Sequence, residues 1–541
     1  MKKILLFLVV VLVTLPVIAQ TNLPVLKAEN SPVGLSEDGF EQPWFVNSKL
    51  RPDVKKTSAK NIVFRSAIDM LSFKLEKGGT FDFVILINGS DSAFTRVEWV
   101  SDNPLQNPPE ELLGLSATGK MSRKQASFDI DALVYNLSEI HPNMYAQCGM
   151  GEFMHAVNEV KSALPDSLSR LALYERVAPL VTMLGDGHTI MRYPFNDVFT
   201  ADLKREPFIL KIDDNDSTAL ILKSACPEIP DSVVIKSING VEMRDMVEWM
   251  TKYTSGERPF FKLYRVNELF PALFQLRYAA ESYEVEFWAG GKIKRATVPA
   301  MTLAEIKASI HPSRKQTPAH DNRPYYYEIC NDGEYAVLTF KYCTGAKEMA
   351  AFADAMVKDL NQRKVKHLII DIRNNGGGDS RVGDELLKRI AAVPFKQFGR
   401  SYCRITPTIQ RMIRQNVNAG IYYNDEPAIM VQPLDASRRF NGKTTLLISH
   451  KTFSSAASFS WAFKQFNMGT VVGEETGGMN VSFGDFLTYR LPISGLSTSI
   501  SYKRFWHYGA DEQEIHGTMP DYTVPQAQAL EFVKKRMDGK R

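Results

Sequence analysis

Two adjacent serines, Ser454 and Ser455, open an apolar, helix-like run in the stretch KTFSSAASFSWAF at 451–463. A serine at the first turn of a helix lies at the positive end of the helix dipole, where a neighbouring backbone N–H group can stabilise an oxyanion. Serine is also a common N-terminal helix cap. The stretch is therefore either a nucleophile site or a cap, and it lacks the GxSxG pattern of α/β-hydrolases.

A second candidate is the stretch HLIIDIRNNGGGDS at 367–380, in which an apolar strand runs into three successive glycines. Without side chains, the backbone N–H groups of this loop could turn toward a developing oxyanion. The phosphate-binding patterns GxGxxG and GK[ST] are absent. The alternative to an oxyanion loop is a tight turn between a strand and a helix.

A serine nucleophile needs a base, and His188 in LGDGHT at 184–189 is a candidate. An imidazole with a pKa of about 6.5 can accept the serine proton at neutral pH. A histidine base in turn needs an acceptor that orients its second ring nitrogen. A single histidine in a turn is more often structural, so His188 depends on its context.

Composition sets wider bounds on these candidates. The chain of 541 residues is long enough for three or four domains, and its 44% hydrophobic and 23% charged residues are typical of a globular protein. The formal net charge of +4 gives no electrostatic case for binding nucleic acid. The five cysteines lack CxxC spacing and the nine histidines lack HExxH spacing, so we expect buried thiols, at most one disulfide, no metal and no cofactor.

The N-terminus has the pattern of a secretory signal peptide. Residues 1–19, MKKILLFLVVVLVTLPVIA, combine a basic start with an apolar run and a small residue at the expected cleavage point. The alternative is an uncleaved anchor, and no later stretch reaches the ~20 apolar residues of a membrane span. We therefore expect a secreted, periplasmic or envelope-associated protein without a membrane span after cleavage.

Patterning along the chain predicts six segments. Alternating residues after an irregular lead-in predict a small β domain, 116–128 reads as a polar linker, and helical periodicity follows to Leu184. A strand, an Asn-Gly turn and an amphipathic helix at 231–250 resemble part of a PDZ domain, which binds an extended peptide at a sheet edge. The remaining βαβ alternation predicts a largely parallel, α/β sheet covered on both faces. The expected segments are a signal peptide at 1–19, a β domain with its lead-in at 20–110, a helical cap at 126–195, a PDZ-like domain at 200–300, an α/β core at 320–525 and a helix or tail at 526–541.

Taken together, LIIDIRNNGGG, SSAASF, GTVVGEETGG and GTMPDYTV, in this order, resemble the S41 family of serine peptidases. That family includes C-terminal processing proteases, tricorn-type proteases and interphotoreceptor retinoid-binding proteins. The resemblance covers roughly 126–525 and implies a ClpP/crotonase-like βαβ catalytic core with a helical cap and a PDZ-like domain. The small β domain lies outside it.

The family register favours Ser454 over Ser455 as the nucleophile, because the family serine lies nineteen residues before the Gly of the VVGE turn, here Gly473. The backbone N–H of Ser455 would then join those of Gly376 and Gly377 in the oxyanion hole. The processing branch has a lysine base where this chain has Met479, and a thioether cannot accept a proton.

The tricorn-like branch instead uses a histidine base, which the resemblance assigns to His188. Its orienting glutamate lies seven residues before the Asp of the Pro-Asp pair, which gives Glu514, with Glu512 and Asp511 as close alternatives. That branch also has a serine directly before its histidine, whereas this chain has Gly187.

The resemblance implies a secreted serine endopeptidase that cleaves polypeptides through an acyl-enzyme, with the PDZ-like module presenting an extended peptide or a free C-terminus. The first alternative is an inactive binding protein on the same scaffold, which Met479 and Gly187 keep open. A second alternative is an adhesion protein that uses the N-terminal β domain.

Overall fold

A computed structural model describes residues 25–26, 61–65, 79–87, 91–99, 107–115, 119–310, 322–413, 420–424, 430–537 and 539. The predicted signal peptide at 1–19 lies outside the described residues. The chain forms two compact units from interleaved segments. The first unit comprises Met1–Arg192, Arg400–Asp425 and Phe483–Phe505, and the second comprises Tyr193–Gly399, Glu426–Ser482 and Trp506–Arg541.

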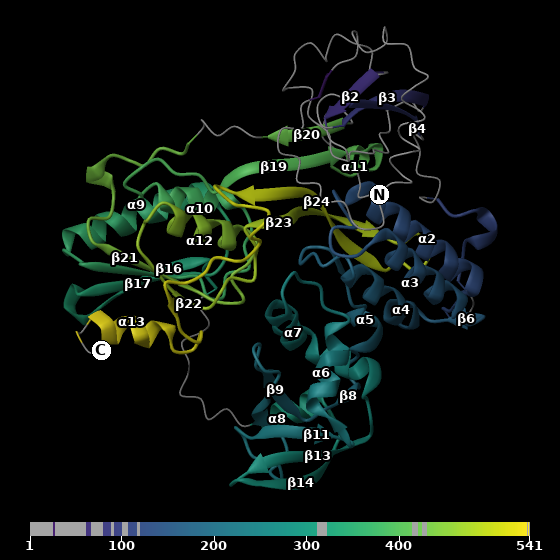
Figure 1. The fold of residues 1–541 in the computed structure, drawn as a ribbon. Helices are drawn as coiled ribbons and strands as arrows, with labels where there is room; N and C mark the ends of the chain where they lie inside the picture. Colours follow the sequence, from purple (N-terminus) through teal and green to yellow (C-terminus); the bar gives the residue numbers. More distant parts are fainter. Residues whose placement is uncertain are drawn as a thin grey trace. The chain divides into compact units, whose positions relative to one another are not determined.

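Three helices of the first unit occupy the segment with helical periodicity. They are α2 (Arg123–Ile140), α3 (Met150–Ser162) and α4 (Arg170–Thr182), shown in blue in Figure 1. The expectation of a linker over 116–128 is wrong at its end, because α2 begins there. Ser122 and Gln125 form a capping box, which satisfies two backbone N–H groups at the start of the helix.

The first unit also contains a sheet whose strands come from distant parts of the chain. Its strand order is β20 (Gly420–Asn424), β19 (Phe398–Ile405), β24 (Ser497–His507) and β23 (Val481–Arg490). The short strand β7 (Ile190–Met191) pairs with β24 in antiparallel orientation, which fixes the end of the segment that carries His188.

A further sheet lies where a small N-terminal β domain is predicted. Its order is β1 (Val25–Leu26), β2 (Asn61–Arg65), β3 (Gly79–Ile87) and β4 (Asp91–Trp99), with β3 and β4 antiparallel. The strands agree with the alternating pattern of this segment.

In the second unit, residues from about 205 to 300 form an antiparallel sheet with helices. The strand order is β14 (Lys292–Pro299), β13 (Ser282–Ala289), β11 (Val234–Ile238), β10 (Ala219–Ser224) and β9 (Phe208–Ile212). Asn239 and Gly240, both with positive φ, turn the chain from β11 into β12 (Val241–Glu242). Helices α6 (Met243–Thr251) and α7 (Pro259–Arg277) follow (Figure 1).

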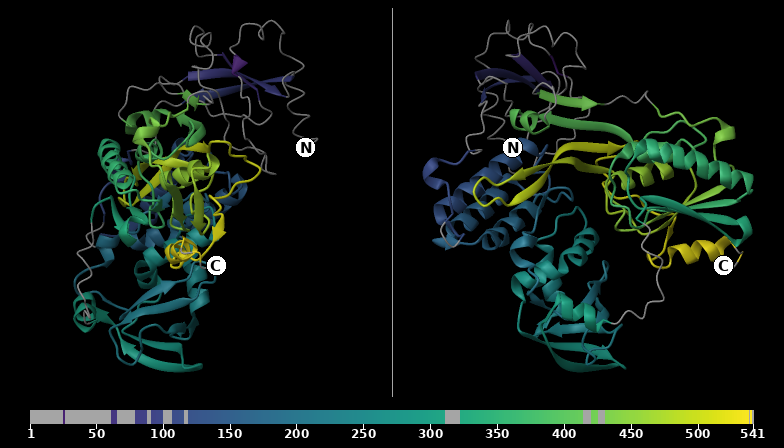
Figure 2. Two further views of the ribbon diagram at one scale, coloured as in Figure 1. Left: turned by 90° about the vertical axis from the view of Figure 1, so that its left-hand side faces the viewer. Right: turned by 180° about the vertical axis from the view of Figure 1, so that it is seen from behind.

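The C-terminal half of the second unit is built on a mostly parallel sheet. Its order is β16 (Tyr325–Cys330), β17 (Tyr335–Phe340), β18 (His367–Asp371), β21 (Lys443–Ile448), β22 (Thr470–Gly473) and β25 (Tyr522–Thr523). Only β16 runs antiparallel to its neighbour. Helices α9 (Ala346–Gln362), α10 (Ser380–Leu387) and α12 (Ser455–Gln465) lie on one side of this sheet, and α13 (Ala529–Met537) lies on the other (Figures 1 and 2). The predicted α/β class is confirmed.

The sheet is buried on both faces because its strands are apolar at successive positions. Leu368 and Ile370 of β18 pack into the core under α9, α10 and α12, whereas Ile369 between them packs with Val533 of α13. Because β18, β21 and β22 run parallel, the loops that follow them leave the same, carboxyl edge of the sheet. These loops carry three of the sequence motifs: the three glycines, the serine pair and GEETGG.

Other broad features follow from the described residues. No helix among them is long and apolar enough to cross a membrane. All five cysteines are free thiols, so the disulfide left open by the sequence does not form. No group of three or more potential metal ligands occurs in the described part of the chain.

Candidate active site

Ser454 stands at the turn between β21 and α12 in a backbone conformation that L-residues rarely adopt. Its φ is 53° and its ψ is −127°, and its side chain makes no capping hydrogen bond to the helix that begins at Ser455. A non-glycine residue held in such a region costs on the order of 1–3 kcal/mol and persists only when its surroundings impose it. The helix-cap interpretation of Ser454 therefore has no hydrogen bond to support it.

Ser455 has a different environment from its neighbour. It is buried, and its hydroxyl donates to the backbone carbonyl of Gly378 over 2.6 Å. This hydrogen bond ties the first turn of α12 to the glycine loop. The Ser455 hydroxyl is thus engaged in structure, while its backbone N–H lies at the start of the helix, where α-helical N–H groups lack intrahelical partners.

The glycine loop after β18 lies directly against the serine turn. A Cβ atom on Gly377, whose φ is 100°, would meet Ser454 Cβ at 2.7 Å and Ser455 N at 2.8 Å. The Gly377 N–H already donates to Asn375 Oδ1 over 2.9 Å. A Cβ atom on Gly376 would meet nothing within 4 Å. Of the two predicted oxyanion donors, Gly376 is therefore the one whose N–H is not already used by Asn375.

Asn375 connects the two loops, and sequence reasoning did not single it out. Its side chain is buried and donates to the Phe340 carbonyl over 3.1 Å, while its own backbone carbonyl accepts from Phe453 N over 3.1 Å. A buried amide with this many partners holds the loops in one register. The signal available in the sequence is its place directly before the three glycines.

The turn GEETGG after β22 also packs on the serine turn. A Cβ on Gly478 would meet Ala457 Cβ at 2.6 Å and Ser454 N at 3.0 Å, so only glycine fits there. The next residue, Met479, is 1% exposed and forms an isolated bridge with Gly517. The position at which the processing branch has a lysine is thus a buried thioether.

The loop that carries Glu514 is fixed to this turn by side chains. Asn480 donates to the Glu514 carbonyl over 3.0 Å and accepts from His516 N over 3.1 Å. Glu475 accepts from Gly517 N over 2.8 Å, and Arg258 of the segment before α7 donates to the Ile515 carbonyl over 2.8 Å. The Glu514 side chain itself is exposed.

His188 lies in the first unit, next to a carboxylate that the sequence interpretation left aside. Asp186 accepts from the backbone N–H of His188 over 2.8 Å, and its Oδ1 lies 3.8 Å from His188 Nδ1. The hydroxyls of Thr189 and Ser501 donate to the other oxygen of Asp186 over 2.5 and 2.6 Å. The His188 side chain is 11% exposed.

Asp186 is fully buried and is held as a carboxylate by its neighbours. His141 Nε2 lies 3.2 Å from its Oδ2. Burial alone raises the pKa of Asp186, but hydrogen bonds and positive charge from His141 and His188 outweigh burial and leave the pKa well below its usual range. The spacing of Asp186 and His188 in LGDGHT was the available signal, whereas His141 is too distant in sequence to be recognised.

The predicted site residues thus fall into two groups. The second unit brings together the turn of Ser454 and Ser455 and the loop of Gly376 and Gly377, and it anchors the Glu514 loop to the turn that packs on Ser454. His188 belongs to the first unit, where Asp186 is its carboxylate neighbour.

Comparisons with known proteins agree with this architecture. Mature CPAF complexed with lactacystin aligns with a TM-score of 0.56 and 12% identity, over 77% of this chain and 97% of that chain. Mature CPAF alone gives a TM-score of 0.54 and 12% identity, over 77% and 96% of the two chains. At 12% sequence identity, this similarity shows a shared fold alone. A search of the curated proteins finds no match.

A family model identifies the core directly from its sequence. The matched residues, 334–524, include all the core strands from β17 to β25 and the loops around Ser454, Gly376 and Glu514. They exclude the antiparallel sheet of residues 208–299 and the helices α2, α3 and α4. Residues 334–524, the core of the chain, are thus similar to peptidase family S41.

Proposed function

We propose that the protein is a serine-type peptidase that cleaves peptide bonds of polypeptides through an acyl-enzyme at Ser454. The observation that carries the proposal is the strained Ser454 backbone at the start of α12, pressed against the glycine loop. Strained backbone of this kind is concentrated at functional sites. The similarity of the surrounding core to family S41 supports the same reaction class.

In the proposed reaction, Ser454 Oγ attacks the carbonyl carbon of the scissile peptide while His188 Nε2 takes its proton. Backbone N–H groups of Ser455 and Gly376 stabilise the oxyanion, and His188 then passes the proton to the leaving amine. Water deprotonated by His188 hydrolyses the resulting ester and restores Ser454. The histidine branch is favoured because Met479 replaces the alternative base.

The nucleophile is tested by labelling. Wild type is expected to react with a fluorophosphonate probe and to cleave unfolded protein, and Ser454→Ala to do neither. Ser455→Ala is expected to be labelled more slowly, since it loses only the hydrogen bond to Gly378. Labelling of Ser454→Ala would reverse the assignment, and an unreactive wild type would favour the binding-protein alternative.

The residue that orients His188 is tested separately. We propose that Asp186 holds the His188 loop, and Glu514 stays the acceptor that the resemblance suggests. Glu514→Gln is expected to lower kcat without changing stability, because Glu514 is exposed. Asp186→Asn is expected to lower both kcat and stability, because it disturbs a buried carboxylate that accepts several hydrogen bonds. If Glu514→Gln retains wild-type kcat and its pH profile, Asp186 alone fills the role.

We further propose that residues 1–19 direct secretion and are removed, and that the antiparallel sheet with α6 acts as a PDZ-like module for an extended peptide. The strand, Asn-Gly turn and helix in this sheet support the second proposal. N-terminal sequencing of protein from an expressing cell tests the first. Binding of peptides that differ only in amidation of the C-terminus tests whether a free carboxylate is recognised.

A further inference from the structure

A pocket in the second unit lies between α13 and the sheet and extends to the amino ends of the core strands. Its volume is about 430 Å³. Its lining includes His367 at the start of β18, Lys443 at the start of β21 and Thr470 at the start of β22. The serine turn and the glycine loop follow the opposite ends of these strands, roughly 13–20 Å away for strands of four to six residues. The pocket is therefore distinct from the proposed peptidase site.

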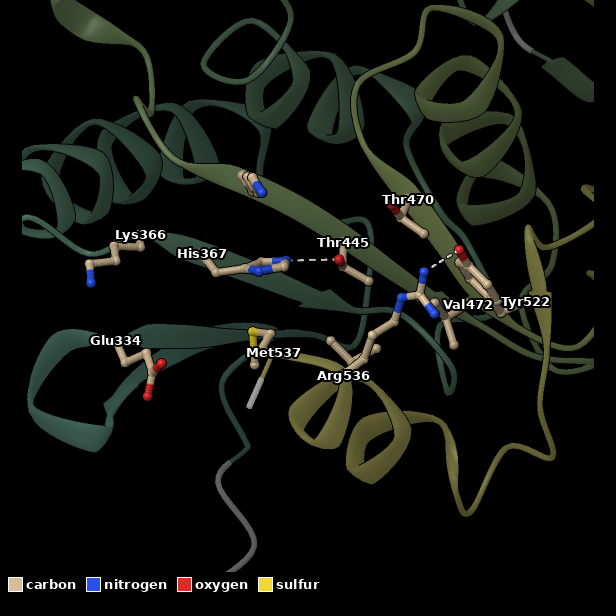
Figure 3. Close-up of a pocket in the computed structure, with 11 residues that line it drawn as sticks. Glu334, Lys366, His367, Thr445, Thr470, Val472, Tyr522, Arg536 and Met537 are labelled. Atoms are coloured by element: carbon tan, nitrogen blue, oxygen red, sulfur yellow. Dashed lines mark hydrogen bonds between the residues drawn. The ribbon is translucent and has the colours of Figure 1, made fainter. Parts of the chain in front are cut away.

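The pocket is formed by two structural elements. His367, Thr445 and Thr470 stand on the strands, and Arg536 and Met537 belong to α13, which covers this face of the sheet (Figure 3). His367 Nε2 lies 2.8 Å from Thr445 Oγ1, so two of the polar groups are already oriented.

The charges around the pocket are predominantly positive. Lys366, Lys443 and Arg536 line it, and Glu334 is its one acidic lining residue. Lys443 N donates to the Lys366 carbonyl over 2.8 Å, which joins the two lysines where β18 and β21 begin. Within the described parts of the chain, no ion pair joins any of the three cations to a carboxylate. A concave surface with unpaired charges of one sign attracts a counter-ion.

Arg536 is held in place by an aromatic side chain of the same pocket. It donates to Tyr522 OH over 2.6 Å, and its guanidinium carbon lies 4.3 Å from the centroid of the Tyr522 ring. Burial lowers the pKa of His367, and the positive charge of Lys443 lowers it further. A neutral His367 leaves the cationic charge to the lysines and Arg536.

Apolar side chains form the remaining wall. Val472 of β22 and Val533 of α13 are 1% and 4% exposed, and Met537 lies beside them. A cavity of this size fits a small molecule with both an apolar body and an anionic group. We propose that this pocket binds a small organic anion, with a carboxylate or phosphate group contacting Lys443 and Arg536 and an apolar body against α13.

Isothermal titration of the full mature protein with phenyl phosphate and with benzoate tests the proposal, and benzyl alcohol serves as the neutral probe. We expect saturable 1:1 binding of at least one anion and none of the alcohol. The relative affinities of the two anions then distinguish a phosphate ligand from a carboxylate ligand. Equal binding of benzyl alcohol, or no binding of either anion, would overturn the proposal.

Variants locate the binding. Lys443→Gln and Arg536→Gln are each expected to weaken anion binding about tenfold, as for loss of one charge-assisted contact. Lys535→Gln, an exposed lysine on the same helix outside the pocket lining, is the matched control and should bind as wild type. Thermal unfolding of each variant establishes that it folds, and equal weakening by Lys535→Gln would indicate unspecific charge attraction.

The independence of the two sites is measured with Ser454→Ala. This variant is expected to bind both anions with wild-type affinity, since the serine turn lies at the other end of the sheet. Loss of anion binding in Ser454→Ala would show that the probes occupy the peptidase site instead. The peptidase proposal itself stands or falls on the labelling experiment and not on this titration.

Discussion

At the scale of single residues, Ser454 combines a hydroxyl, the proposed nucleophile, with a backbone conformation that lowers the stability of the fold. Its positive φ is unfavourable for any residue with a Cβ atom, and glycine adopts it without strain. Removal of the side chain therefore has two separable effects, loss of the hydroxyl and release of backbone strain.

The two effects are separated by comparing two variants that both lack the hydroxyl. Ser454→Gly is expected to unfold at a higher urea concentration than Ser454→Ala, by on the order of 1 kcal/mol in unfolding free energy, because only glycine releases the strain. Equal stabilities of the two variants would mean that the turn relaxes without cost.

A second prediction at this scale concerns a buried acid in the second unit. Burial raises the pKa of Glu206 to about 7, and Gln275 Nε2, 3.5 Å from its Oε2, offsets this only in part. The folded state keeps the proton that the unfolded state loses near pH 4, so stability falls as the pH rises from about 4 to 7.

Glu206→Gln should remove this dependence. The variant is expected to be more stable than wild type at pH 8 by on the order of 3 kcal/mol, with little difference at pH 4. Urea unfolding at both pH values measures it. A wild type whose stability does not decline between these values would contradict the raised pKa of Glu206.

At the scale of elements, the glycine loop after β18 provides a matched pair of substitutions. Gly377 has a φ of 100° and lies against Ser454 and Ser455, whereas Gly376 has open space around it. Gly377→Ala is expected to lower the unfolding free energy by roughly 2–4 kcal/mol through strain and displacement of the serine turn. Gly376→Ala should change it by less than about 1 kcal/mol.

Circular dichroism during urea unfolding compares the two variants. Similar losses of stability in Gly376→Ala and Gly377→Ala would mean that the close approach of the loop to the serine turn is not maintained in solution. A selective loss in Gly377→Ala would support the packing on which the proposed oxyanion site depends.

At the scale of the whole molecule, the second unit joins its antiparallel sheet and its core through α7. Phe261 of α7 stacks on Phe453, directly before Ser454, with ring centroids 4.4 Å apart. Arg265 lies over both rings, 4.8 Å and 5.6 Å from their centroids. The helix α7, in the same segment as the antiparallel sheet, is thus in contact with the serine turn.

Phe261→Ala is therefore expected to lower both stability and kcat, whereas Phe274→Ala on the same helix should lower stability alone. Both rings are buried, and each truncation should cost about 3–5 kcal/mol. Phe274 contacts rings of its own helix and sheet, such as Phe270 and Tyr283, and among the described residues no ring contact joins it to Phe453. Peptidase assays below the unfolding transition compare the two, and equal kcat values would exclude a role of α7 in positioning Ser454.

The sequence predicted the features that depend on local pattern. Alternation of β-branched strands and amphipathic helices predicted the α/β core, and the motifs around Ser454 and the three glycines predicted which loops meet. The register that favoured Ser454 agrees with its strained backbone, although its role stays a proposal.

The features that the sequence did not reveal depend on long-range pairing. The environment of His188 is completed by β24, as in the hydrogen bond from Ser499 to the His188 carbonyl over 2.8 Å. His141 and Ser501 reach Asp186 in the same way from distant positions. No periodicity in a single stretch encodes such contacts, and the exposed Lys443 and Arg536 likewise acquire meaning only when the strands and α13 meet.

The interleaving of the two units has a consequence for biosynthesis. The first unit contains Phe483–Phe505, so the strand β24 that pairs beside His188 emerges only after most of the chain has been made. Domains generally fold as they emerge, N-terminal first, but this unit cannot be completed in that order. The proposed base would therefore reach its final surroundings only late in synthesis, which would delay any proteolytic activity until the nascent chain is almost finished.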